Sequence, residues 1–409
     1  MVIFAKCNQE NKMKAIKVIL LLFIICSFHS GICTAQWVKV SNVIGNRDIY
    51  SLAATGNYIF AGTDPSGVYL STNDGTNWTQ TSLNNRTVNT LTINGNDIFA
   101  GTENYGVYLS QNNGATWLQI SLNNRDIRSL IINANDIYAG TNLYGVYKNG
   151  IQTSLNNRYV YSLASNGNNI FAGTTNYGVY LSTNNGTTWA QTSLNNLTVY
   201  SLAINGNKIF AGTGSTSGVY LSTNNGTTWT QTPLNNVTVY SQTVIGNNIF
   251  AGTFQNGVFI STDNGTNWTQ KNEGLGILSV NAFCVLNDYI FAGTIGNSVY
   301  RRPLSELIGI QPISNEVPKE YSLSQNYPNP FNPVTKIRFS IPVGTRHGAF
   351  IKIIVFDVTG REVAILVNEQ LKPGTYEVEW YATNFPSGVY YYTLSSGEFS
   401  ETGKAILVK

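Results

Sequence analysis

Short alternating runs of apolar and polar residues, separated by Asn-Gly turns, fill most of the chain between residues 36 and 303. One unit reads Thr198-Val-Tyr-Ser-Leu-Ala-Ile, Lys208-Ile-Phe-Ala-Gly-Thr, Gly218-Val-Tyr-Leu-Ser and Thr228-Trp-Thr-Gln-Thr. Runs of this length that are rich in β-branched and aromatic residues predict strands, and the Asn-Gly pairs predict tight hairpins. Each unit therefore predicts four short antiparallel strands.

A tetrapeptide, Phe/Tyr-Ala-Gly-Thr, marks seven copies of this unit. The copies begin at intervals of 33 to 41 residues, at Phe60, Phe99, Tyr138, Phe171, Phe210, Phe250 and Phe291. A period near 40 with four strands per unit is typical of β-propeller blades. An open repeat solenoid is the alternative.

The two ends of the repeat array complement one another. The last copy has three strands and stops at Pro303, whereas Gln36-Trp-Val-Lys-Val-Ser41 resembles a fourth strand and precedes the first full copy. An N-terminal strand that completes the last blade would join the ends and remove open sheet edges. The sequence thus predicts an all-β protein with a closed seven-bladed β-propeller over residues 36–303, rather than a solenoid.

A second motif, Ser-x-Asn/Asp-x-Gly-x-x-Trp, lies between the third and fourth strands. It resembles the Asp-box (BNR) repeat of sialidase-like and sortilin-like propellers, an element of the fold that says little about reaction. The third copy has Lys148-Asn-Gly150 in its place. The matching residues are Asn73, Gly75, Trp78, Asn112, Gly114, Trp117, Asn184, Gly186, Trp189, Asn224, Gly226, Trp229, Asp263, Gly265 and Trp268.

The N-terminus has the pattern of an export signal. Lysines precede an apolar run from Val18 to Phe28, which is too short to span a bilayer, and Cys33-Thr-Ala35 suits cleavage before Gln36. We expect residues 1–35 to be a signal peptide, with a buried helix as the alternative. Only Cys284 then remains in the mature chain, so no internal disulfide is expected, and no transmembrane segment is expected either.

Composition changes after Pro303. Residues 304–319 show no periodicity and are predicted to be a linker, whereas residues 320–409 contain several strand patterns and predict a small Ig-like β-sandwich. Five segments of this part, in order, resemble the type A C-terminal sorting domain of the bacterial type IX secretion system. The matching residues are Asn326, Pro328, Asn329, Pro330, Phe331, Asn332, Pro333, Gly360, Arg361, Gly374, Gly388 and Lys404.

This second resemblance implies a two-step export route. The signal peptide would take the chain across the inner membrane, and the type IX translocon would then recognise the folded terminal domain. The protein would be secreted or attached to the outer-membrane surface. A plain Ig-like accessory module is the alternative reading of residues 320–409.

Charge and histidine content exclude several functions. The chain has 24 Lys and Arg against 21 Asp and Glu, and four Lys and one Glu lie in the predicted signal. A neutral mature chain is not expected to bind nucleic acid. Residues 36–303 contain no histidine, because the chain has only His29 and His347. Histidine-based catalysis and histidine-bound zinc are therefore not expected there, and we expect neither metal nor cofactor.

The loops between the fourth strand of one unit and the first of the next carry the best ligand-binding candidates. They repeat Leu-Asn-Asn-Arg, and the loops between second and third strands, expected on the same face, add aromatic residues including Phe254. Such a patch suits an unidentified glycan or protein ligand, held by stacking and planar hydrogen bonding. Turn formation by Asn and solvation of Arg are the alternative roles. The candidates are Arg47, Arg86, Arg125, Arg158, Tyr105, Tyr144, Tyr177, Asn124 and Asn157.

A glycoside hydrolase is the alternative function. The resemblance to Asp-box propellers implies a sialidase as one possibility. Sialidases hold the substrate carboxylate with an arginine cluster and use a Tyr/Glu pair as nucleophile and an Asp as acid/base. The arginines here occupy equivalent positions in the repeat, and the Arg-Ile-Pro motif of that family is absent. Glu103 and Asp126 fall on the candidate face, so carboxylate chemistry stays open. We expect a binding module and predict no catalytic residue.

Overall fold

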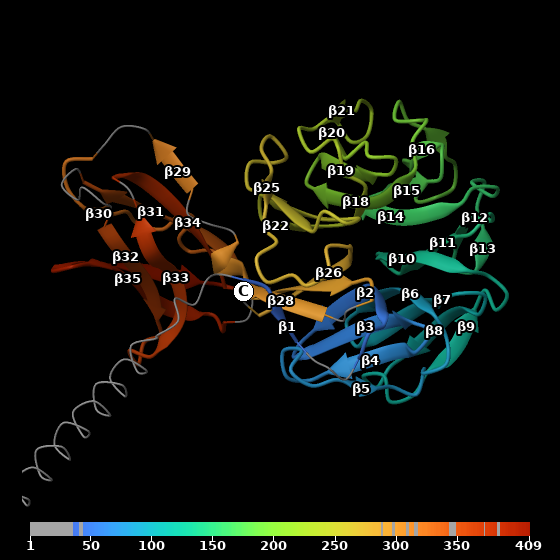
Figure 1. Cartoon of the computed structure of the whole chain (residues 1–409), viewed down its shortest axis with the longest axis horizontal. Helices are drawn as coiled ribbons and strands as arrows, with labels where there is room; N and C mark the ends of the chain where they lie inside the picture. Colours follow the sequence, from blue (N-terminus) through green and yellow to red (C-terminus); the bar gives the residue numbers. More distant parts are fainter. Residues whose placement is uncertain are drawn as a thin grey trace, which may run out of the picture. The chain divides into compact units, whose positions relative to one another are not determined.

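The computed structural model describes residues 36–40, 44–287, 289–296, 299–307, 311–314, 318–342, 349–371, 373–382 and 385–409. The predicted signal peptide, residues 1–35, and part of the predicted linker lie outside these ranges. Regular structure in the described residues is β apart from one 3-10 turn, Leu304–Glu306, which confirms the predicted all-β class (Figure 1). No helix in these ranges is long and apolar enough to cross a membrane.

Seven four-stranded antiparallel sheets account for the described strands up to Pro303, and we number them blades 1 to 7. Each of the first six blades is a meander, in which consecutive strands are neighbours. The strands are β2(Asp48–Thr55), β3(Tyr58–Asp64), β4(Gly67–Ser71) and β5(Thr79–Gln80) in blade 1; β6(Val88–Asn94), β7(Asp97–Thr102), β8(Gly106–Ser110) and β9(Leu118–Ser121) in blade 2; β10(Ile127–Asn133), β11(Asp136–Thr141), β12(Gly145–Lys148) and β13(Ile151–Gln152) in blade 3; β14(Val160–Asn166), β15(Asn169–Thr174), β16(Gly178–Ser182) and β17(Ala190–Gln191) in blade 4; β18(Val199–Asn205), β19(Lys208–Thr213), β20(Val219–Ser222) and β21(Thr230–Gln231) in blade 5; and β22(Val239–Ile245), β23(Asn248–Thr253), β24(Val258–Ser261) and β25(Thr269–Gln270) in blade 6.

Blade 7 joins the two ends of the array. Its strands β26(Val280–Leu286), β27(Tyr289–Thr294) and β28(Val299–Pro303) are completed by β1(Val38–Lys39) from the other end. Val38 pairs with Arg301 and Lys39 with Tyr300. The first strand of each blade contacts the first strand of the next, and β2 of blade 1 contacts β26 of blade 7, so the ring closes (Figure 1). The array is therefore a propeller rather than a solenoid.

The turn motif between the third and fourth strands is held by a buried serine hydroxyl. In blade 5, Ser222 Oγ accepts hydrogen bonds from the backbone N–H groups of Gly226, at 2.8 Å, and Asn224, at 3.4 Å. Asn224 Oδ1 accepts the N–H of Thr228 at 2.9 Å, and the Trp229 indole N–H donates to the Gly226 carbonyl. Asn thus makes the turn bond that Asp263 makes in blade 6 through its own Oδ1.

Replacement of the blade 5 serine by Ser222→Ala should lower the free energy of unfolding by about 1–3 kcal/mol, because the buried Gly226 N–H loses its acceptor. Urea unfolding of residues 36–409 measures this change. Ser193→Ala is the matched control, since Ser193 is exposed and donates one hydrogen bond to the Thr227 carbonyl. A loss at Ser222 no larger than at Ser193 would show that the motif does not stabilise the blade.

Blade 3 lacks the turn motif and so shows which side chains the motif covers in the other blades. In blade 5 the turn glycine, Gly226, lies against Phe171 of blade 4, which is fully buried. Where blade 3 has the shorter Asn149-Gly150 turn, a cavity of about 220 Å³ lies between blades 2 and 3. Phe99, the blade 2 residue equivalent to Phe171, is 6% exposed, and Gly150 does not lie against it. Loss of the motif therefore leaves this aromatic side chain less completely covered.

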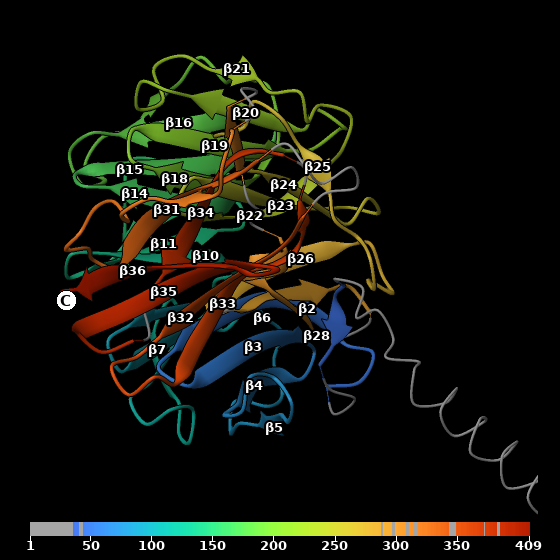
Figure 2. The same ribbon diagram turned by 90° about the vertical axis from the view of Figure 1, so that its left-hand side faces the viewer.

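The C-terminal residues form two further four-stranded sheets with one shared core. The first has the order β29-β34-β31-β30. The second has the order β33-β32-β35-β36 (Figure 2). Buried residues from both sheets, such as Phe339 and Tyr392, belong to one apolar cluster. The strands are β29(Gln311–Ser314), β30(Ser322–Leu323), β31(Val334–Ile341), β32(Ala349–Phe356), β33(Glu362–Leu371), β34(Gly374–Tyr381), β35(Gly388–Ser396) and β36(Phe399–Leu407).

Candidate functional site

Three consecutive blades present the same arginine-tyrosine pair. The guanidinium carbon of Arg86 lies 3.9 Å from the ring centroid of Tyr105, and Arg125 and Arg158 each lie 4.1 Å from the centroids of Tyr144 and Tyr177. The arginine precedes the first strand of its blade, and the tyrosine lies between the second and third strands. Both loops therefore lie on one face of the propeller. The rings remain 45% to 47% exposed.

In blades 3 and 4 a second tyrosine, on the third strand, accepts a hydrogen bond from the arginine and holds its side chain in place. Arg125 Nε donates to the hydroxyl of Tyr147 at 3.2 Å, and Arg158 Nε donates to the hydroxyl of Tyr180 at 3.1 Å. This hydrogen bond is the main reason why the pKa of Arg125 is raised. Nη1 of each arginine donates to the carbonyl of the preceding asparagine, Asn124 or Asn157. Within the described residues, Nη2 of neither side chain makes a hydrogen bond.

The loop that carries each tyrosine is held rigidly. The outermost strand of the blade supplies a glutamine whose amide donates to the tyrosine carbonyl, as Gln152 does to Tyr144 at 2.8 Å. Gly145 follows with a φ of 67°, and a Cβ there would lie 1.8 Å from the Leu155 carbonyl oxygen. Glycine is therefore required at this turn.

The pattern changes around the ring. Arg47 has no tyrosine in its second-to-third-strand loop and instead donates to Ser66 Oγ and the Ile44 carbonyl, each at 2.6 Å. Blades 5 and 6 replace the arginine with Leu197 and Val237, of which Val237 is buried. Asn124 and Asn157 are exposed beside their arginines. The structure thus brings eight of the nine candidates into three blades and places Arg47 apart.

Phe254 does not belong with the loop tyrosines. It follows Thr253 directly, which makes it equivalent to Glu103 in blade 2, and its ring contacts Tyr240 at 5.6 Å between centroids. Phe254 lies in the second-to-third-strand loop, as expected, but two residues before the position that the tyrosine occupies in loops of the same length. Phe254 instead belongs to a second cluster closer to the propeller axis.

This second cluster arises from a β-bulge that recurs in all seven blades. The register of the first strand against the second shifts at its second residue, as between Val199 and Ser201 in blade 5. A bulge re-aims the side chain of its extra residue. We call the seven side chains at this position the inner ring: Tyr50, Asn89, Arg128, Tyr161, Tyr200, Tyr240 and Asn281.

Four of the seven inner-ring residues are tyrosines, and three of these lie in consecutive blades. Consecutive ring centroids lie 4.8 Å apart for Tyr161 and Tyr200 and 5.2 Å apart for Tyr200 and Tyr240, both edge to face. Tyr159 and Phe254 extend the row at its two ends, with centroid distances of 4.6 and 5.6 Å. We call these five residues the aromatic arc. They come from three adjacent blades, so they line one side of the propeller axis at the face that carries the arginine-tyrosine pairs.

The other side of the inner ring is polar and centred on Asp126. Its carboxylate accepts hydrogen bonds from Arg128 at 2.6 Å, Asn89 at 3.1 Å and Asn142 at 3.2 Å, and it is 8% exposed. Arg128 also lies 3.9 Å from Glu103. We call Asn89, Asp126, Arg128 and Glu103 the polar arc. Sequence reasoning found the two carboxylates but not their common partner Arg128.

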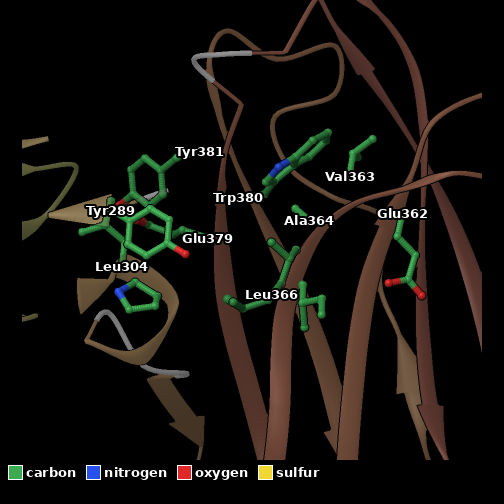
Figure 3. A pocket seen from close by; sticks show the side chains of 12 residues that line it. Tyr289, Leu304, Glu362, Val363, Ala364, Leu366, Glu379, Trp380 and Tyr381 are labelled. Carbon is green, nitrogen blue, oxygen red and sulfur yellow. Dashed lines mark hydrogen bonds between the residues drawn. The ribbon is translucent and has the colours of Figure 1, made fainter. Parts of the chain in front are cut away.

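A separate cavity of about 390 Å³ borders the C-terminal domain. Val363, Ala364 and Leu366 of β33 and Trp380 of β34 line it on that side (Figure 3). Its only acidic residues are Glu362 and Glu379, and its wall is otherwise mostly apolar or aromatic. It lies outside the candidate face of the propeller.

The sorting-motif residues hold a proline-rich segment against the last strand. Asn326, 1% exposed, donates through Nδ2 to Thr335 Oγ1 and the Pro328 carbonyl. Asn329 bonds the backbone of Lys404 and Ile406, and buried Phe331 exchanges backbone hydrogen bonds with Ile406 and Val408. Pro328, Pro330 and Asn332 between these anchors are exposed, and Pro333 is half-buried.

The remaining motif residues form turns and strand ends. Gly360 has a φ of 82° in the turn where Arg361 pairs with Asp357 at 3.0 Å. The hydrogen bond from Thr359 is the main cause that lowers the pKa of Asp357, to about 2. Gly374 and Gly388 begin β34 and β35, and Lys404 lies on β36. These residues therefore belong to both sheets of the domain.

Solved structures with a similar fold are propeller proteins of low sequence identity. YCF48 from Cyanidioschyzon merolae gives a TM-score of 0.53 at 11% identity, over 66% of this chain and 98% of that one. Virginiamycin B lyase from Staphylococcus aureus gives a TM-score of 0.54 at 11% identity, over 66% of this chain and 99% of that one. These likenesses concern the fold alone. The comparison with curated proteins gave no match.

The C-terminal residues match a protein-family model. Residues 325–409 match the secretion system C-terminal sorting domain. This finding agrees with the motif resemblance and with the folded domain described above, and it indicates export to the cell surface or beyond. The chain thus combines a propeller-type all-β fold with a C-terminal sorting domain of the type IX secretion system.

Proposed function

We propose that this protein is an exported binding module. Residues 36–303 form a propeller that holds a glycan or protein ligand. Residues 304–319, which include strand β29 of the C-terminal sheet, link the propeller to the sorting domain, and the type IX translocon recognises residues 320–409. Residues 1–35 serve as a signal peptide for the first membrane. The mature protein then acts outside the cell or attached to its surface.

The arginine-tyrosine pairs are the observation that carries the binding role. A structural tyrosine in this fold is buried, as Tyr138 is, whereas Tyr105, Tyr144 and Tyr177 are nearly half exposed on a rigid loop. Tyrosine and arginine are the residues most often found at energetic centres of interfaces. A preorganised guanidinium with a free Nη2 also loses little entropy on binding.

A glycoside hydrolase remains the second candidate because Glu103 and Asp126 both approach Arg128. Asp126 is nevertheless occupied by three internal donors and buried. That environment suits a carboxylate that positions Arg128 better than one that attacks a substrate. Hydrolysis of a glycoside by the mature protein that is lost in Glu103→Gln would establish the enzymatic alternative.

The double variant Arg125→Ala/Tyr144→Ala should weaken ligand binding about tenfold or more, since it removes one stacked pair from the middle blade of the three. Glycan arrays and pull-downs from surface extracts identify the ligand, and surface plasmon resonance measures its affinity. Asn235→Ala, on the equivalent loop of blade 6, is the control and should bind as the wild type does. Equal binding by all three proteins would contradict the proposal.

A further inference from the structure

The aromatic arc is built differently from the aromatic core of the blades. Phe171, Phe210 and Phe250 are fully buried between sheets. The rings of Tyr200 and Tyr240, in contrast, are partly exposed and contact one another across blade boundaries at the end of the innermost strands. Tyrosine is favoured where one end of a side chain is apolar and the other is wet. The arc therefore presents apolar ring surface together with hydroxyl groups.

These hydroxyls remain available as neutral hydrogen-bonding groups. Burial is the main cause that raises the pKa values of Tyr200 and Tyr240, and it raises that of Tyr159 to about 12. The phenols are thus protonated in neutral solution. Among the described residues, no hydrogen bond joins the Tyr200 or Tyr240 hydroxyl to another group. Both can donate to and accept from a ligand.

The polar arc offers hydrogen-bonding groups and carries no unpaired positive charge among the described residues. Asp126 is neutralised by Arg128 and saturated by the two asparagine amides. Asp64, in blade 1, accepts from Thr87 at 2.7 Å and Tyr50 at 3.5 Å. These two donors are neutral, and Glu103 lies 3.9 Å from an Arg128 that already pairs with Asp126, so this side keeps negative charge and would repel an anionic ligand group. A neutral ligand with many hydroxyls would meet planar amides, a guanidinium and phenols.

We propose that the inner ring binds the end of a neutral oligosaccharide, with a pyranose face on the aromatic arc and its hydroxyls directed to the polar arc. The C–H face of a pyranose is apolar and its rim is polar, which matches the two halves of the ring. This inference rests on the proposed binding function and names the ligand class. The arginine-tyrosine pairs then contact residues of the glycan further from its end.

The experiment titrates the mature chain, residues 36–409, with hexasaccharides of β-1,4-glucan, β-1,4-xylan and α-1,6-mannan in a calorimeter. At least one should bind saturably. Tyr200→Ala/Tyr240→Ala should weaken that binding by about thirtyfold or more, because hot-spot aromatics dominate such contacts. Tyr200→Phe keeps the aromatic ring and should weaken binding of the hexasaccharide only several-fold. Arg125→Ala/Tyr144→Ala should weaken it about tenfold.

Thermal unfolding of each variant ensures that lost binding does not reflect lost fold. The inference is overturned if none of the three hexasaccharides binds, or if binding survives Tyr200→Ala/Tyr240→Ala. It is also overturned if a peptide or a charged glycan binds while the neutral ones do not. In that last case, binding that still depends on Arg125 and Tyr144 would leave the proposed function standing. Failure of every ligand class would overturn both.

Discussion

Removal of residues 320–409 should abolish delivery to the cell surface and leave the propeller in the periplasm. The physical reason is that recognition needs the folded domain: Asn326 and Phe331 are buried anchors that hold the exposed prolines between them against β36. Surface immunolabelling and protease accessibility of intact cells measure the loss. We expect at most a few per cent of the wild-type surface signal.

The test requires that the truncated chain, which lacks residues 320–409, still folds. Strand β1 closes the ring by pairing with β28, so every blade strand is retained in the truncated chain. Protease resistance of the periplasmic product checks this point. The full-length variant Arg125→Ala/Tyr144→Ala is the export control, since its changes leave the sorting domain intact. Unchanged surface delivery of the truncated chain would refute the assignment of residues 320–409.

Trp37→Ala should lower the free energy of unfolding by about 3–5 kcal/mol. The Trp37 side chain is 1% exposed and packs with Phe250 and Val258 of blade 6. Its backbone N–H donates to the Glu273 carbonyl at 2.7 Å, and its indole N–H donates to the Lys271 carbonyl at 2.8 Å. The substitution therefore leaves a cavity at the seam where the ring closes.

Differential scanning calorimetry of the mature chain measures this effect, as a fall in Tm of the order of 10 °C. Val38→Ala is the neighbouring control, since Val38 is 49% exposed and should change Tm little. Trp37→Phe keeps most of the side-chain volume, so its Tm should lie between those of Trp37→Ala and Val38→Ala. Equal Tm values for Trp37→Ala and Val38→Ala would mean that the N-terminal strand does not lock the ring.

The closure of the ring can be predicted from the sequence because the patterns that indicate it lie within short segments. The Trp37 segment carries the same tryptophan-led pattern as other fourth strands, and the last copy lacks one. Strand count and hairpin turns therefore predicted the pairing of β1 with β28. The turn motif was predictable for the same reason, because Ser222, Asn224 and Gly226 bond within a few residues of one another.

The inner ring was not predictable because its position depends on register. Tyr200 follows the ordinary alternation of a strand in sequence, and only the bulge between Val199 and Ser201 re-aims it. The contact of Tyr200 with Tyr240 spans two blades. Phe254 likewise lies in the expected loop but two positions before the loop tyrosines, where its ring reaches Tyr240. Such features follow from pairing between strands, which no single repeat reveals.

Arg302 is a second case of this kind. It reads as a charged residue at the end of the repeat array, yet its side chain is 2% exposed and pairs with Glu273 at 2.8 Å and Glu306 at 3.2 Å. Glu273 lies in the loop between blades 6 and 7, 29 residues before Arg302 in the sequence, so the contact arises only when the strands of blade 7 have paired. A buried arginine with two carboxylate partners is a long-range feature that composition cannot indicate.

The central claim is that the exported propeller binds its ligand outside the cell through the face that carries the arginine-tyrosine pairs and the inner ring. Binding of the array-identified ligand, fluorescently labelled, to intact cells tests it most directly. Cells that display the wild type should capture the ligand, whereas cells displaying equal amounts of Arg125→Ala/Tyr144→Ala should capture about tenfold less. Equal capture by both strains, or by a strain lacking the protein, would contradict the account.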